Sequence, residues 1–161
     1  MILRSARLSL EPISPDLARR IIERDELPGD DWHREYPLED ELNPLESLSA
    51  AEPTNSPFTM YLVRRAEDGR AVGGFGFFGP PDATGQAEFG YGLVSSARGA
   101  GLATEAVRLA LDHASSWGAR IAVADTDLEN IASQQVLMKN GFVEVDRDES
   151  LVYHRRSFAS R

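Results

Sequence analysis

The sequence predicts an α/β fold, more narrowly α+β, with a mixed, mostly antiparallel central sheet of about seven strands and about four helices. Three short apolar segments in the middle of the chain are separated by turn residues, which predicts consecutive antiparallel strands. A later segment, 102–117, contains no glycine or proline and predicts a helix that crosses over to a parallel strand. The 161 residues suit one domain with its own core, so we expect a single domain over 1–161.

Apolar periodicity and turn residues divide the whole chain into strands and helices. The expected elements are, in chain order, strand 2–10, a helix from 15 to about 27, short helices 38–42 and 44–51, strands 58–65, 71–78 and 87–94, helix 102–117, strand 120–124, helix 130–139, and a last hairpin of strands 142–145 and 151–158. No internal repeat, low-complexity run or linker interrupts this order.

Capping and turn residues support these boundaries. Ser14 is a good N-cap, and Pro15 suits the first position of the helix that follows. The dipeptide 68–69 is Asp-Gly, a strong hairpin signal, and the dipeptide 140–141 is Asn-Gly, which ends a helix. The last hairpin offers a strand edge that could pair with a second copy, so a homodimer is expected as one option.

The segment 30–57 is acidic and contains four prolines, which predicts short helices with irregular joints. Loop-rich segments over a rigid scaffold commonly shape a substrate site. Trp32, His33 and Tyr36 are therefore candidate lining residues, and a tryptophan packed in the core is the alternative.

Charge is concentrated in one part of the chain. Residues 23–52 carry eleven acids against two arginines, so this block alone accounts for the net charge of −9. Such a block argues against nucleic-acid binding and towards a cationic partner or substrate. A merely solvated acidic helix surface is the alternative.

Composition excludes several further classes. The chain has no cysteine, which excludes disulfides, thiolate metal sites and a cysteine nucleophile. The three histidines are far apart in sequence, so no metal site is expected. No apolar run approaches the roughly 20 residues that span a bilayer, and the N-terminus lacks the apolar core of a secretory signal. We therefore expect a cytoplasmic protein without a membrane partner.

The stretch 98–104, Arg-Gly-Ala-Gly-Leu-Ala-Thr, joins the predicted strand 87–94 to the long helix. A helix start leaves several backbone N–H groups without partners at the positive end of the helix dipole, which suits an anion. Gly99 and Gly101 have no Cβ to block a phosphate, and Arg98 adds a cation. The alternative is that the glycines only shape a tight turn.

With these elements placed, the chain resembles the GNAT superfamily of acyl-CoA-dependent N-acetyltransferases, and most closely its ribosomal-protein N-terminal acetyltransferase (RimJ/RimL-like) branch. Residues 98–106 match the family's Q/R-x-x-G-x-G/A signature, and residues 130–142 match its helix along the pantetheine arm. The resemblance covers nearly all of the chain and is weakest over 28–57. It implies acetyl-CoA as co-substrate, no metal, and a splayed cleft between strands four and five, 87–94 and 120–124.

The resemblance also implies which residues hold coenzyme A. The N–H groups of 99–103 would bind the pyrophosphate, and the strand ending at Leu93 and Val94 would pair with pantetheine as an added strand would. An N–H of Leu93 or Val94 would stabilise the oxyanion, and Gly90 and Gly92 suit a bulge that opens the cleft. The implied cofactor-binding residues are Leu93, Val94, Arg98, Gly99, Ala100, Gly101, Leu102, Ala103, Thr104, Asn130 and Ser133.

Acetyl transfer needs a neutral amine, whereas a free alkyl amine has a pKa near 10.4 and is mostly protonated. Glu88 is the candidate base, because it lies on the strand that forms the cleft, a position that several family members use. Asp125 and the acidic segment compete for this role. A solvated edge carboxylate is the alternative for Glu88.

The leaving thiolate needs a proton, which many family members take from a tyrosine on the second helix. Leu137 stands at that position here, so the usual acid is absent. Ser133 is the candidate catalytic hydroxyl, as the RimJ/RimL-like branch implies. Tyr91 and Tyr153 are alternatives. Asn130 and Ser133 could also serve only as ordinary helix caps.

Together these features predict an N-acetyltransferase that acts on a primary amine, either a protein N-terminus or a small amine. Direct attack in a ternary complex is expected, because there is no cysteine to carry an acyl intermediate. A non-catalytic acyl-CoA-binding protein and a protein-interaction module that uses the acidic block are the alternatives. The fold alone does not name the acceptor, which the acidic block suggests is cationic.

Overall fold

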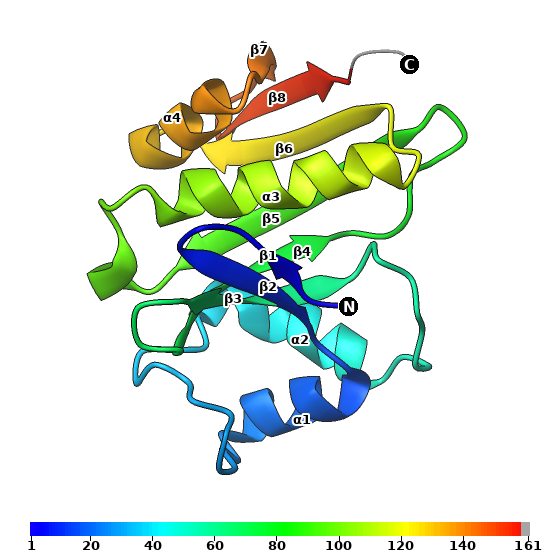
Figure 1. Cartoon of the computed structure of the whole chain (residues 1–161). Helices are drawn as coiled ribbons and strands as arrows, with labels where there is room; N and C mark the ends of the chain where they lie inside the picture. The colour runs from blue at the N-terminus through cyan, green and yellow to red at the C-terminus, as the bar shows by residue number, and fades with distance from the viewer. Residues whose placement is uncertain (159–161) are drawn as a thin grey trace.

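The computed structural model describes residues 1–158, and its centre is one open eight-stranded sheet in the order β1-β2-β3-β4-β5-β6-β8-β7 (Figure 1). The strands are β1 (Leu3–Arg4), β2 (Leu8–Pro12), β3 (Met60–Arg65), β4 (Ala71–Phe77), β5 (Gln86–Leu93), β6 (Ile121–Asp127), β7 (Val143–Arg147) and β8 (Leu151–Ser157). Neighbouring strands pair antiparallel, except that β5 and β6 are parallel. The predicted mixed, mostly antiparallel sheet is confirmed.

Four α-helices flank the sheet, and two short 3-10 turns precede two of them. These elements are α1 (Pro15–Glu23), η1 (Glu39–Glu41), α2 (Leu42–Ser49), η2 (Ser95–Ala97), α3 (Leu102–Ser116) and α4 (Ile131–Lys139). In Figure 1, α3 runs across the sheet in front of β5, and α1 packs against α2 at the far end of the molecule. The predicted helices that become α1, α3 and α4 are confirmed, and α1 ends earlier than expected because Arg24 adopts a left-handed conformation with φ 56°. Of the two short helices expected at 38–42 and 44–51, the first is the 3-10 turn η1 and the second is α2, which begins two residues earlier than expected.

The N-terminal strand differs from the prediction. Residues 2–10 form two strands, β1 and β2, rather than one, and the backbone reverses where the Ser5 N–H donates to the Leu8 carbonyl. The turn carries no glycine or proline signal. It is held instead by Glu105 on α3, which accepts hydrogen bonds from the Ser5 hydroxyl at 2.5 Å and the Arg7 amide at 2.9 Å. A tertiary contact therefore sets this turn.

The core lies between the sheet and its helices. The buried face of α3 contributes Ala106, Val107, Ala110 and Leu111, and an aromatic row on the sheet includes Phe75 and Phe89, whose ring centroids are 5.2 Å apart. Trp32 and Tyr36 are also buried in this core, so the packing alternative holds for Trp32, and neither of the two cavities described below is lined by Trp32, His33 or Tyr36. Among the helices that the structure describes, none is long and apolar enough to cross a bilayer.

Strands β5 and β6 separate part-way along their length. Residues 86–88 of β5 pair with residues 121–123 of β6, and pairing between the two strands ends there, whereas β4 stays paired with β5 up to Leu93. The splay that the sequence predicts between its fourth and fifth strands is therefore present. At the far side of the sheet β7 is the edge strand, with Val143 and Val145 exposed, and pairing there with a second copy stays a prediction.

Candidate active site

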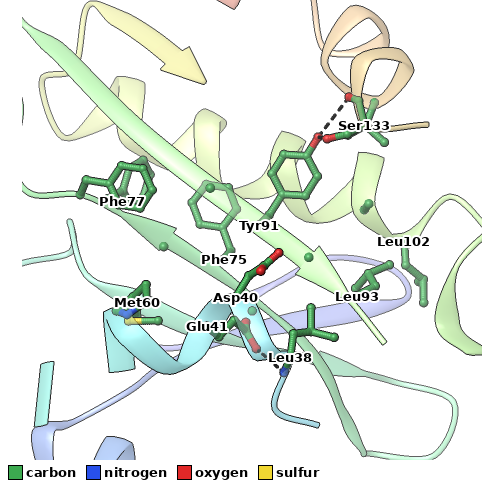
Figure 2. A pocket seen from close by; sticks show the side chains of 18 of the residues that line it. Leu38, Asp40, Glu41, Met60, Phe75, Phe77, Tyr91, Leu93, Leu102 and Ser133 are labelled. Atoms are coloured by element: carbon green, nitrogen blue, oxygen red, sulfur yellow. Dashed lines mark hydrogen bonds between the residues drawn. The ribbon is translucent and has the colours of Figure 1, made fainter. Parts of the chain in front are cut away.

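A cavity of about 1160 Å³ occupies the splay and extends to both sides of the sheet (Figure 2). Its wall combines the segment before α2, the middle of β4 and β5, the start of α3 and one side of α4. A smaller cavity of about 200 Å³ adjoins it on the β6 side and shares Gly90, Tyr91, Asp125, Asn130 and Ser133 with it. A single space thus connects the glycine turn, the open strand edge and the acidic segment.

The outer edge of β5 presents unpaired backbone groups to this space. The Phe78 N–H donates to the Glu88 carbonyl and the Val94 N–H donates to the Val72 carbonyl, so even-numbered residues of β5 use their backbone groups on β4. In an antiparallel pair, the backbone N–H and C=O groups of the alternate residues, here the odd-numbered ones, point away from β4 to the opposite edge of β5. Since β6 pairs only as far as Glu88, the N–H groups of Tyr91 and Leu93 face the splay.

This geometry corrects the implied role of Val94. Its N–H is already bonded to β4, and its side chain is fully buried outside the cavity lining. Leu93, which lines the cavity, is the residue whose N–H is directed at the gap. The strand alternation decides between the two, and the family motif alone did not.

The glycine turn has the conformation that an anion cradle requires. Gly99 and Gly101 have φ values of 85° and 82°, which glycine adopts without strain, and Gly101 caps α3. Arg98, Gly99, Gly101 and the first three residues of α3 line the cavity. The helix start therefore directs its free N–H groups and its positive dipole end into this space. Ala100 does not line the cavity, contrary to expectation.

Two arginines brace this turn from either side. The Arg98 Nε donates to the Leu93 carbonyl at 3.0 Å, which ties the turn to the end of β5. From the β1–β2 turn, Arg7 donates through Nη1 to the Ala100 carbonyl at 2.6 Å and through Nε to Glu105 at 2.8 Å. Arg7 brings a cation to the cradle although it lies 93 residues before Ala100 in the sequence, and no sequence pattern indicated this.

Two hydroxyl groups meet on the α4 side of the cavity. The Tyr91 Oη and Ser133 Oγ lie 2.7 Å apart (Figure 2). Burial raises the pKa of Tyr91 to about 12, although the hydrogen bond with Ser133 lowers it slightly, so the phenol stays protonated at neutral pH. Asn130 caps α4 by accepting the Ser133 N–H at 3.1 Å. Tyr153 lies elsewhere and donates to Asp148, and Leu137 is fully buried.

On the α2 side, the cavity has a floor made of four glycines, which we call the glycine floor: Gly74, Gly76, Gly90 and Gly92. They pair in register across β4 and β5, Gly74 with Gly92 and Gly76 with Gly90, without a bulge. The expected bulge at Gly90 and Gly92 is therefore wrong. These glycines instead leave room for side chains that lie directly over the strands.

Glu41 is one of these side chains. A Cβ on Gly74 would overlap the Glu41 Oε1, and the other carboxylate oxygen accepts the Leu38 N–H at 3.2 Å. Burial raises the pKa of Glu41 to about 7, with the Leu38 hydrogen bond lowering it and the Asp40 charge raising it further. Figure 2 shows Asp40 and Glu41 across the cavity from Ser133. Only these two of the eleven acids in 23–52 line the cavity.

Glu88 lies on the same face of β5 as Gly90 and Gly92, but it is exposed and outside the cavity lining. Partial burial and the neighbouring Asp125 raise its pKa. Asp125 itself lines the cavity. The structure thus brings together most of the predicted site residues: Leu93, Arg98, Gly99, Gly101, Leu102, Ala103, Thr104, Asn130 and Ser133. Of the predicted set, Glu88, Val94 and Ala100 do not join them.

The family assignment follows from comparison with known proteins. A family model for the acetyltransferase (GNAT) domain matches residues 7–143. The chain belongs to this family. It is an acyltransferase enzyme by that membership, and GNAT acetyltransferases use acetyl-CoA as their acetyl donor. No curated protein sequence matches the chain closely enough to serve as a relative.

Solved GNAT structures share this fold at low sequence identity. A GNAT-family acetyltransferase from Bacillus anthracis has 16% identity and a TM-score of 0.70, with 98% of both chains covered. The ribosomal-protein-S5-alanine acetyltransferase from Vibrio fischeri has 15% identity and a TM-score of 0.69, covering 98% of this chain and 96% of that chain. The ribosomal acetyltransferase RimL in complex with coenzyme A has 18% identity and a TM-score of 0.69, with 98% of both chains covered. At these identities the likeness describes the fold.

Proposed function

We propose that this GNAT protein transfers the acetyl group of acetyl-CoA to a primary amine by direct attack within a ternary complex. The observation that supports this most directly is the continuity of one cavity. The same space joins the helix-start cradle, the open edge of β5 and a wall that carries carboxylates. A phosphate-bearing thioester and a cationic acceptor therefore have complementary surfaces at opposite sides of one cavity.

In this proposal the cradle binds the pyrophosphate of coenzyme A. The N–H groups of Gly99 and 101–104 supply hydrogen-bond donors, and Arg98 and Lys139, both in the cavity wall, supply positive charge. The free edge at Tyr91 and Leu93 supplies backbone groups for the pantetheine amides, as in strand addition. Asn130 and Ser133 form the facing wall on α4.

The chemical step needs an oxyanion donor and a proton for the leaving sulfur. The Leu93 N–H faces the splay and supplies the oxyanion donor. The hydroxyl pair of Tyr91 and Ser133 supplies a proton to the thiolate, since the phenol stays protonated at neutral pH. Ser133 thus keeps the catalytic role expected for it, and Tyr91 acts beside it.

The acceptor is a protein N-terminus or a small amine, and a carboxylate accepts its proton. The sequence predicts Glu88 for this role, whereas Asp40, Glu41 and Asp125 are the carboxylates that line the cavity. RimL, one of the proteins of similar fold, is a ribosomal L7/L12 alpha-N-protein acetyltransferase, which makes protein N-termini one substrate class to test. The carboxylates in the cavity wall favour a cationic acceptor.

The first test is calorimetric titration of acetyl-CoA into the wild type and into Gly101→Glu. The variant places a negative charge at the cradle, so we expect at least a 100-fold weaker Kd. Gly118→Glu is the matched control, because Gly118 also has a positive φ, of 101°, but follows the other end of α3. The control should bind acetyl-CoA as the wild type does.

Two results would contradict the proposal in different ways. No binding to folded wild type would remove the donor assignment and leave only the fold. Tight binding without acetylated product, across protein N-termini and small amines, would instead favour a non-catalytic acyl-CoA-binding protein.

A further inference from the structure

The α2 side of the cavity carries one half-buried acid, Glu41, among apolar side chains. Over the glycine floor lie Glu41 at Gly74, Met60 at Gly76, Phe78 at Gly90 and Leu38 at Gly92. The other three covering side chains are apolar, and Phe78 is 62% exposed although it borders the cavity. One carboxylate surrounded by apolar side chains suits the binding of a ligand that has a single positive charge on an otherwise apolar body.

Glu41 lies close to the edge where the thioester is proposed to sit. Its carboxylate covers Gly74, which pairs with Gly92 on β5, and the next residue along β5 is Leu93, whose N–H faces the splay. Neighbouring strands are about 4.8 Å apart, so the carboxylate is about one strand spacing from β5. A group at that place can reach an amine poised at the edge directly or through one water.

No cation in the cavity wall neutralises Glu41 within the described chain. It forms none of the ion pairs found in residues 1–158, and the one hydrogen bond that its carboxylate accepts there is from the Leu38 N–H. The titratable groups around it are Asp40 and Tyr36 from its own segment, Tyr91 from β5, Asp125 from β6, and Arg98 and Lys139 beside the cradle. β4 presents only glycine and aromatic residues there.

We infer that Glu41 receives the ammonium group of the acceptor and takes its proton, and that the acceptor carries this amine on an apolar body. The inference rests on the proposed acetyltransferase function and deepens it. Glu88, outside the cavity lining, then has no direct part in the proton transfer. Met60, Phe78 and Leu38 contact the apolar body of the acceptor.

The step balances as follows. The ionised Glu41 carboxylate takes one proton from the acceptor ammonium, which leaves a neutral amine and a carboxylic acid. The nitrogen lone pair forms the C–N bond at the thioester carbonyl, whose π electrons move to an oxygen held by the Leu93 N–H. When the carbonyl reforms, the C–S bond breaks, and the sulfur receives a proton from the Tyr91–Ser133 hydroxyl pair. The positively charged nitrogen of the intermediate releases one proton, which restores that pair through water, and keeps its remaining proton as the amide N–H. Glu41 then loses its proton to solvent, so the products are the acetylated amine, the free thiol of coenzyme A and one proton.

The burial of Glu41 suits this role. A carboxyl group with a pKa of about 7 is partly ionised at neutral pH and matches the task of a base better than an exposed one does. The pH dependence of kcat/KM should therefore show a limb near 7, with activity rising as Glu41 loses its proton.

The test compares the wild type, Glu41→Gln and Glu39→Gln with acetyl-CoA and three probe amines. The probes are 2-phenylethylamine, a tetrapeptide with N-terminal phenylalanine, and spermidine. Glu39 is the matched control, because it is an exposed acid two residues away that does not line the cavity. Rates are measured from pH 5.5 to 9, and binding of 2-phenylethylamine to the CoA-saturated protein is measured separately.

We expect Glu41→Gln to lower kcat at least 100-fold, to remove the limb near pH 7 and to leave the Kd of acetyl-CoA within threefold of wild type. Glu39→Gln should keep the wild-type kcat, the limb near pH 7 and the wild-type Kd of acetyl-CoA. The two apolar amines should exceed spermidine at least tenfold in kcat/KM, and the ratio between them separates a small-molecule acceptor from a peptide one. A Glu41→Gln protein within threefold of wild type in kcat, with the limb intact, would overturn the role of Glu41.

Equal or better use of spermidine would overturn the assigned acceptor class. If the wild type turns over no probe, the binding measurement decides, and equal 2-phenylethylamine affinity in wild type and Glu41→Gln rejects the inference. Loss of acetyl-CoA binding by the wild type itself is the separate failure of the proposed function. These outcomes therefore distinguish a failure of the role assigned to Glu41 from a failure of the proposed acetyltransferase function.

Discussion

The Tyr91 Oη and the Ser133 Oγ lie 2.7 Å apart and connect β5 to α4 at the point where the sheet has opened. The serine is held in place by the cap of its own helix, because its N–H donates to Asn130. The phenol is mostly buried, and residue 137 on α4, where the family resemblance implied a tyrosine, is a fully buried leucine. The site therefore presents its phenol from the strand rather than from the helix.

Tyr91→Phe should lower kcat about 100-fold without changing the Kd of acetyl-CoA, because it removes the proton donor and keeps the ring. Ser133→Ala should cost less, since it leaves the phenol in place. Tyr153→Phe is the control, because that hydroxyl donates to Asp148 outside the cavity. Since the pKa of Tyr91 is about 12, wild-type activity should show no loss between pH 8 and 10 from its ionisation. Wild-type kcat in Tyr91→Phe would exclude the phenol as the donor.

Glu41→Gln should make the protein more stable at alkaline pH. The folded-state pKa of about 7 lies above the ordinary 4.5, so the folded protein binds this proton more tightly than the unfolded chain. Wild-type stability therefore falls as pH rises from about 4.5 to about 7. The difference corresponds to about 3 kcal/mol at pH 8, since each pKa unit is about 1.4 kcal/mol.

Urea unfolding at pH 4 and pH 8 measures this effect. Glu39→Gln should change the free energy of unfolding by less than about 0.5 kcal/mol at both pH values, as exposed substitutions usually do. A Glu41→Gln protein that is less stable than wild type at pH 8 would contradict the assigned burial of this carboxylate.

Gly74→Ala should displace the Glu41 carboxylate, because the added methyl group would occupy the position of its Oε1. We expect kcat to fall at least tenfold, and the free energy of unfolding to fall by about 1–3 kcal/mol from overpacking. Gly76→Ala, on the same face of β4, meets the Cγ of Met60 at 3.3 Å, and that flexible side chain can yield. Adding Gly74→Ala to Glu41→Gln should cost little further activity, and full additivity of the two losses would show that they act separately.

Glu105→Gln should loosen the N-terminal hairpin from α3. Burial raises the pKa of Glu105, but hydrogen bonds from Ser5 and Arg7 outweigh it and lower the pKa overall. This stability is present above the ordinary glutamate pKa of 4.5 and is lost as pH falls through the lower folded-state pKa. Urea unfolding at pH 7 should show a loss of about 2 kcal/mol, as for hydrogen bonds to a charged group. Glu67→Gln, in the exposed β3–β4 turn, is the control. An equal loss of stability in that variant would show that the Glu105 hydrogen bonds make no specific contribution to stability.

Most of the fold was predictable because its signals are local. Ser14 and Pro15 start α1, the Asp-Gly dipeptide at 68–69 turns β3 into β4, and Asn-Gly at 140–141 follows α4, as predicted. The split of residues 2–10 into two strands was not predictable in this way. Its turn depends on a contact with Glu105, about 100 residues away in sequence, and a local pattern carries no information about such a partner.

The coenzyme side of the candidate site was also better predicted than the acceptor side. The cradle is one continuous motif, so Gly99 and Gly101 could be identified from spacing. Glu41 is one of eleven acids in 23–52, and nothing in the sequence separates it from the exposed ones. What distinguishes Glu41 is that it fits over Gly74, which has no side chain. Gly74 lies on β4, so this relationship can be recognised only from the structure, where β4 and the segment before α2 lie together.

The early end of β5–β6 pairing has a mechanical consequence. Three residue pairs join the strands β1 to β5 to the strands β6, β8 and β7, so the sheet is two half-sheets with a short seam. An acetyl-CoA molecule bound along the free edge of β5 and against α4 would contact both sides of that seam and hold the two half-sheets together. Backbone amides of β6 and β8 should then exchange their hydrogens more slowly with coenzyme A present, while those of β2 and β3, beyond the seam, should change less.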